Sequence, residues 1–218
     1  MPMIAIAGCD GAGKSTLVRS LAAALVERGF ETEIVDKWDI FDPARHPECA
    51  FLAGGPERLK QCVSAMDGVA RALFIFWMIS LTLKRIDAAS ERIYLLDGYW
   101  MKHAAAEILL GCPPEVVLAT VNALPEADLT IFLDVSADTA LGRRQQRSRY
   151  ECGRGPQSSR AAFCAHQSKV GALLSELARE RGWVRIDSGM SRESVLLEVL
   201  KRIASGLRLA PQAALSPG

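Results

Sequence analysis

Short apolar runs alternate with longer amphipathic segments along the chain. Five runs predict buried strands, at 3–7, 31–36, 92–97, 128–135 and 183–187. Between them, apolar residues recur three or four positions apart, which predicts helices at 17–28, 57–66, 68–88, 100–110, 115–124, 161–181 and 191–207. Strands that alternate with helices indicate an α/β fold. We expect a doubly wound, mostly parallel five-stranded sheet with helices on both faces.

Three segments depart from this pattern. Between 37 and 56, prolines, glycines and aspartates replace the periodicity, so we expect a long loop of the kind that usually carries function. The segment 143–160 is rich in arginine and contains glycines, and residues 209–218 are rich in alanine and proline. We therefore expect one domain over 1–208, with an arginine-rich lid near 143–160 and a disordered tail at 209–218.

Composition narrows the class of partner. Half of the 218 residues are apolar, and the formal net charge of +1 does not indicate a broad basic face for nucleic acid, so we expect small-molecule partners. The six cysteines form no CxxC pair, which favours reduced thiols in the cytoplasm. The first apolar run lacks a basic segment before it, and the most apolar helix, 72–83, is too short to cross a bilayer. We expect neither a signal peptide nor membrane association.

Residues 7–16, AGCDGAGKST, match GxxxxGK[ST] between the first predicted strand and the first predicted helix. There the glycines let backbone amides turn toward phosphate oxygens, and the helix N-terminus favours negative charge. Lys14 is expected to reach the β- and γ-phosphates, and the Ser15 hydroxyl to bind Mg²⁺. A chance glycine-rich turn is the alternative, but strand, loop and helix come in the order that a phosphate-binding loop requires. We expect ATP and Mg²⁺, with these loop contacts: Gly8, Asp10, Gly11, Ala12, Gly13, Lys14, Ser15 and Thr16.

Asp97 ends the apolar run 92–97, and ligands bind at the carboxyl edge of a parallel sheet. A carboxylate at that edge suits Mg²⁺ or its bound water, or orients the attacking oxygen. The alternative is an aspartate that merely caps the next helix. With a phosphate-binding loop nearby, we favour the functional interpretation and count Asp97 as a catalytic and metal-binding candidate.

The arginines of 143–160 are candidates for stabilising transferred charge. A flexible basic segment beside a phosphate-binding loop can close over the triphosphate. The alternative is a solvated basic helix face. With Lys14 and Asp97, the arginines chosen as catalytic candidates are Arg143 and Arg147.

Four segments make the chain resemble the thymidylate kinases, within the nucleoside monophosphate kinases. They are GCDGAGKST at 8–16, LLDGY at 95–99, FLDV at 132–135 with Arg143 and Arg147 beyond it, and WVRIDS at 183–188. Together they span nearly the full length. The resemblance implies a P-loop NTPase fold and the reaction of ATP with dTMP to give ADP and dTDP.

The resemblance also implies roles for individual residues. Asp10 would face the sugar of the acceptor, and Asp187 and Ser188 would flank the adenine ring. The predicted acceptor contacts are Asp10, Lys37, Asp97 and Tyr99. Thymidylate kinases tend to be dimers, so the resemblance implies a homodimer. The helix expected over 72–83 would form either the dimer interface or internal core.

The chain departs from the family pattern on the acceptor side. The family has an arginine after the strand-end aspartate, where this chain has Gly98, and another that contacts the acceptor, where this chain has Met78. Lys37 supplies one positive charge nearby, as a point charge and not a bidentate fork. Besides a nucleotide kinase, two hypotheses remain open: a kinase for a nucleoside or other small alcohol, and a nucleotide-binding regulatory protein with little turnover.

Overall fold

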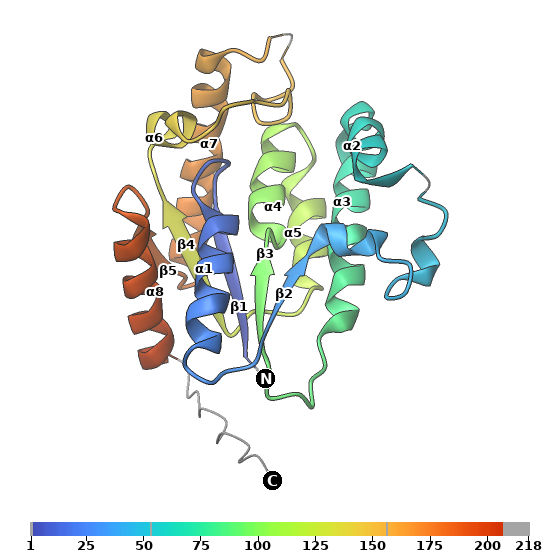
Figure 1. Cartoon of the computed structure of the whole chain (residues 1–218). Coiled ribbons are helices and arrows are strands. Elements are labelled where there is room, and N and C mark those ends of the chain that lie inside the picture. The colour runs from blue at the N-terminus through green and yellow to red at the C-terminus, as the bar shows by residue number, and fades with distance from the viewer. Residues whose placement is uncertain (1, 53, 156, 207–218) are drawn as a thin grey trace.

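The computed structural model describes residues 2–52, 54–155 and 157–206 (Figure 1). Within them, five strands form one parallel sheet in the order β2-β3-β1-β4-β5. The strands are β1 (Met3–Gly8), β2 (Thr32–Asp36), β3 (Ile93–Asp97), β4 (Leu129–Asp134) and β5 (Val184–Asp187). The predicted fold class is confirmed, and each predicted strand forms within one or two residues of its expected ends.

Helices cover both faces of the sheet. The first three are α1 (Lys14–Val26), α2 (Gly55–Ala65) and α3 (Gly68–Thr82), followed by α4 (Trp100–Leu109) and α5 (Pro114–Asn122), and by α6 (Ala137–Gly142), α7 (Arg160–Glu180) and α8 (Arg192–Gly206). In Figure 1, α1 and α8 lie in front of the sheet and contact each other, while α4 and α7 pack against β1 from behind. Because all five strands are parallel, their carboxyl ends point to one edge of the sheet, at the top of Figure 1.

The three central strands are the centre of the core. Every residue of β1 is buried, and in β3 and β4 the only residues not fully buried lie at the ends. Side chains buried on both faces explain why these strands appear in the sequence as continuous apolar runs. The sheet is therefore a rigid frame for the loops at its carboxyl edge.

The segment 37–56 is more ordered than its sequence indicates. It contains two short 3₁₀ helices, η1 (Lys37–Phe41) and η2 (Pro47–Cys49). Asp36 and Asp39 form a reciprocal capping box at the start of η1. Ile40 and Cys49 pack with Met78 and Leu81 of α3 in a second apolar cluster, which fixes the segment against that helix.

The end of one predicted helix differs from the structure. The helix expected over 68–88 ends at Thr82, and a 3₁₀ turn, η3 (Leu83–Arg85), follows it. Asp67 stands at the N-cap position of α3, but its side chain makes no capping hydrogen bond, whereas Ser136 does cap α6.

No helix among the described residues is long and apolar enough to span a membrane. All six cysteines are free. The tail expected at 209–218 lies outside the described residues.

Candidate active site

The loop between β1 and α1 adopts a conformation that depends on its glycines. Gly8, Gly11 and Gly13 have φ angles of 152°, 87° and 96°. A Cβ atom on Gly11 would lie 2.5 Å from the carbonyl oxygen of Ala140, so no larger residue fits there. Gly13 precedes the first turn of α1, whose free amides face the carboxyl edge of the sheet. This arrangement fits the predicted phosphate-binding loop.

Lys14 and Ser15 bring a cation and a hydroxyl to the same place. The Lys14 ammonium donates a 2.7 Å hydrogen bond to the Cys9 carbonyl, so it lies folded over its own loop. Burial lowers the pKa of Lys14, although Asp10 opposes the shift. The Ser15 hydroxyl donates to Asp97 Oδ1 at 3.1 Å. The predicted metal candidates, Ser15 and Asp97, are thus adjacent although 82 positions separate them in the sequence.

A cavity of about 500 Å³ opens over this loop. Its walls come from the loop, the end of β3, the segment after α6 and the start of α8. Residues predicted from the sequence that line it are Asp10, Gly11, Ala12, Gly13, Lys14, Ser15, Thr16, Lys37, Asp97, Arg143 and Ser188. The volume and the phosphate-binding loop suit a nucleoside triphosphate.

Three arginines of the lid segment 143–160 have different surroundings. Arg143 donates hydrogen bonds to the carbonyls of Ser188, at 2.6 Å, and Ala12, at 3.4 Å, so it links the phosphate-binding loop to the turn after β5. Arg144, which was not singled out from the sequence, also lines the cavity and pairs with Glu151. Among the described residues, Arg147 lines neither this cavity nor the next, and its Nε is buried without a hydrogen-bond partner.

The two residues predicted beside the adenine ring lie at the end of β5. Ser188 is buried, and its amide donates to the Asp134 carbonyl at 2.8 Å. Asp187 is exposed, and its carboxylate accepts a 2.8 Å hydrogen bond from the Gly189 amide. Ser188 therefore lines the cavity, whereas Asp187 holds the turn behind it.

A second cavity, of about 630 Å³, adjoins the first. Its walls come mainly from α2, α3, α4 and the lid segment. Five residues line both cavities: Asp10, Lys37, Trp38, Lys102 and His103. A molecule in the second cavity would therefore meet one in the first beside Asp10. We call this shared region the junction.

Asp10 is held in an ion pair at the junction. Its carboxylate oxygens lie 3.1 and 3.4 Å from the Lys102 ammonium, and its amide donates to Gln167 Oε1 at 2.9 Å. Burial alone would raise the pKa of Asp10, but the positive charges of Lys102 and Lys14 outweigh it and lower the pKa to about 2. Asp10 is therefore a carboxylate at neutral pH, and Lys102 is its counter-ion.

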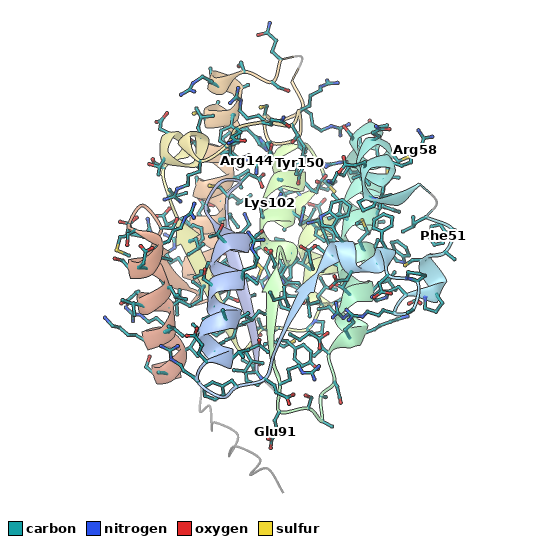
Figure 2. All side chains as sticks on the ribbon, in the orientation of Figure 1. Phe51, Arg58, Glu91, Lys102, Arg144 and Tyr150 are labelled. Carbon is teal, nitrogen blue, oxygen red and sulfur yellow. The ribbon has the colours of Figure 1, made fainter. Side chains whose placement is uncertain are left out.

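Several residues of the second cavity were not predicted from the sequence. Arg71 of α3 is buried, and its guanidinium lies 2.6 Å from Glu107 of α4 and 4.3 Å from the Tyr150 ring centroid. The Lys102 ammonium lies 5.0 Å from the same centroid. Figure 2 shows Lys102, Tyr150 and Arg144 gathered above the carboxyl edge of the sheet. The one charged residue in the segment 68–82 was the signal for Arg71.

Tyr99, predicted as an acceptor contact, lies elsewhere. It is buried, and its hydroxyl donates a 2.6 Å hydrogen bond to the Pro125 carbonyl. Burial raises its pKa. Within the described chain Tyr99 lines neither cavity, so its contact with a substrate stays a prediction.

Fold and site together define a class of protein. A parallel sheet whose first strand leads through a GxxxxGKS loop into a helix, with a strand-end aspartate beside the serine, is a P-loop nucleotide-binding fold. No family model matches the chain.

Curated relatives narrow the class to a family. A thymidylate kinase of Xanthomonas campestris pv. campestris is 30% identical over 174 residues, which cover 76% of this chain and 71% of the relative. Thymidylate kinases of Cereibacter sphaeroides and Desulfotalea psychrophila are 27% and 25% identical, each over 95% of this chain and 96% of the relative. The chain belongs to the thymidylate kinase family.

Proposed function

We propose that this chain transfers the γ-phosphoryl group of ATP to dTMP, giving ADP and dTDP. Membership of the family supports a phosphotransferase. The observation that carries the proposal is the pair of cavities that meet at Asp10, one over the phosphate-binding loop and one between α3, α4 and the lid. ATP in the first cavity and a nucleotide in the second would present their phosphates to each other at the junction.

The reaction needs positioning and charge stabilisation more than covalent help from the protein. An oxygen of the acceptor phosphate attacks the γ-phosphorus, and the bond from that phosphorus to the β–γ bridging oxygen breaks, so ADP leaves. The loop amides and Lys14 would hold the β- and γ-phosphates. Arg143 and Arg144, which line the first cavity, would stabilise charge on the transferred group. Arg147 stays a catalytic candidate from the sequence alone.

The site offers a fitting pair of ligands for Mg²⁺. Ser15 and Asp97 present two hard oxygen donors 3.1 Å apart at the phosphate-binding loop. Mg²⁺ commonly takes one or two protein oxygens and completes its shell with phosphates and water. Bound there, the ion would neutralise charge on the triphosphate. The proposed partners are thus small nucleotides and Mg²⁺, and the proposed compartment is the cytoplasm.

The test is formation of ADP from ATP with single acceptors. We expect turnover with dTMP and none above the ATP-only background with thymidine. Turnover of thymidine without dTMP would favour the nucleoside kinase hypothesis. ATP binding without any acceptor-dependent ADP would favour the regulatory protein.

Asp97→Asn should lower kcat by about 100-fold or more, because the substitution removes the negative charge and replaces one carboxylate oxygen by an amide nitrogen. The Mg²⁺ concentration for half-maximal rate should rise as well. Asp134→Asn is the matched control, since Asp134 ends β4, pairs with Arg185 and does not line the first cavity. Equal losses in both variants would argue against a role for Asp97.

A further inference from the structure

The Lys37 ammonium lies beside Gly98, the residue directly after Asp97. Gly98 has a φ of 74°, and a Cβ atom built on it would lie 3.6 Å from the Lys37 ammonium. Lys37 begins η1 after β2, and β2 and β3 are paired so that Asp36 lies opposite Asp97. The order of the strands therefore brings the Lys37 ammonium over the residue that follows Asp97.

The Lys37 ammonium has no protein anion bound to it. Among the described residues its side chain makes no ion pair or hydrogen bond, and its nearest aromatic contact is the Trp38 ring, 5.2 Å away at the centroid. Burial and then the charge of Lys102 lower its pKa to about 8, against the opposing charges of Asp36, Asp97 and Asp10. A cation desolvated in this way gains most from an anion that enters the cavity.

Lys102 reaches the same junction from α4. Like Lys37, it lines both cavities. Asp10 raises the pKa of Lys102 above its ordinary value despite burial, so the group stays charged. An ammonium group has three donors, and Asp10 does not use all of them. Two partly buried cations share the junction with a single paired carboxylate, Asp10.

We propose that Lys37 and Lys102 form the subsite for the phosphate group of the acceptor. The subsite takes a phosphate monoester dianion and holds it at the junction, facing the γ-phosphate over the loop. Two lysine ammonium groups thereby take the place of the arginine guanidinium groups that the family has at the positions of Gly98 and Met78. The inference rests on the proposed function, and it assigns the contacts with the acceptor phosphate to two lysines of this chain.

Lys37→Met tests the subsite. We expect the KM for dTMP to rise about 10- to 100-fold, because one charge-assisted contact to the phosphate is lost. The KM for ATP should stay within about twofold, and so should the inhibition constant of thymidine, which shares the base and sugar but has no phosphate. Lys37→Arg should recover most of the affinity for dTMP.

Lys84→Met is the matched control. The Lys84 ammonium pairs with Glu48 at 2.9 Å, its side chain is exposed, and it lines neither cavity. Its removal takes away one positive charge of the same kind without touching the junction, so the KM for dTMP should stay within about twofold. An equal rise in Lys37→Met and Lys84→Met would overturn the subsite, because it would reduce the effect to overall charge.

Lys102 is tested by Lys102→Arg and Lys102→Met together. Lys102→Met also leaves Asp10 without its counter-ion, so its melting temperature is measured alongside. We expect Lys102→Arg to keep the fold and most of the affinity for dTMP, and Lys102→Met to lose about 10-fold or more of that affinity while thymidine binds as before. A loss shared by thymidine and dTMP would overturn the phosphate role of Lys102.

The two proposals fail in different ways. If the wild-type chain turns over another nucleoside monophosphate but not dTMP, only the base in the proposed function is wrong, and the lysine variants are then measured with that monophosphate. If thymidine is the acceptor, both proposals fall. If dTMP is turned over and Lys37→Met leaves its KM unchanged, the function stands and the subsite falls.

Discussion

Lys37 is the residue whose charge is most sensitive to pH at the junction. With a pKa of about 8, it is charged at neutral pH and loses its proton in mildly alkaline solution. Because the protonated form is the one that attracts phosphate, the KM for dTMP should rise several-fold between about pH 7 and pH 9.5. Initial rates at saturating ATP across that range measure it.

Lys37→Arg is the control for this pH dependence, because a guanidinium stays charged over the whole range. The rise in KM should be absent or much smaller in that variant. Lys14 also has a lowered pKa, so the KM for ATP is followed in parallel to separate donor from acceptor. The same rise in wild type and Lys37→Arg would assign the titration to another group.

Two kinds of site residue were predictable from the sequence: members of a contiguous motif and residues at the ends of strands. Lys14 and Ser15 were found because the loop motif is a contiguous pattern with a mechanical meaning. Asp97 was found because strand ends share one edge of a parallel sheet. Lys102 and Arg71 were not, because each reaches the cavity only through the rotation of its helix against its neighbours. That rotation is set by tertiary packing, which a single sequence does not display.

At the scale of elements, α7 fastens the lid to the phosphate-binding loop through one buried side chain. Gln167 accepts a 2.9 Å hydrogen bond from the Asp10 amide and donates one of 2.8 Å to the Glu151 carbonyl. The side chain is 2% exposed, so water does not readily replace either bond. A glutamine suits both partners, since its amide group carries an acceptor and a donor.

Gln167→Leu should destabilise the fold by about 1–3 kcal/mol for each backbone group left without a partner. Urea denaturation followed by circular dichroism measures the free energy of unfolding. Gln157→Leu, at an exposed position in the segment before α7, is the control and should change it by about 0.5 kcal/mol or less. If the two variants are equally stable, Gln167 does not fasten the lid.

The type of each element was predictable from the sequence, but the ends of some were not. The apolar pattern of 68–88 continues past Thr82, yet the chain turns through η3, where Arg85 pairs with Glu33 and Asp39. Those partners lie in β2 and η1, so the end of α3 depends on contacts between distant segments. Tyr99 shows the same limit at the start of α4, where the structure turns its ring into the core.

At the scale of the whole molecule, the helices behind the second cavity are joined by a buried ion pair. Arg71 and Glu107 are 3% and 1% exposed, and they connect α3 to α4. The Tyr150 hydroxyl lies 3.3 Å from the same Glu107 oxygen, so the pair also supports the lid. Burial raises the pKa of Glu107, and the charge of Arg71 opposes that rise. Each charge is therefore tolerated only because the other is present.

Removing one partner should cost far more than removing both. Arg71→Met leaves a carboxylate buried without its counter-ion, and we expect a loss of about 3–5 kcal/mol, a large share of the stability of a domain this size. In the double variant Arg71→Met/Glu107→Met no charge remains uncompensated, so most of the loss should be recovered. Urea denaturation of both single variants and the double variant gives the coupling energy. Additive losses would mean that the two charges act independently, and the second cavity would then need another source of rigidity between α3 and α4.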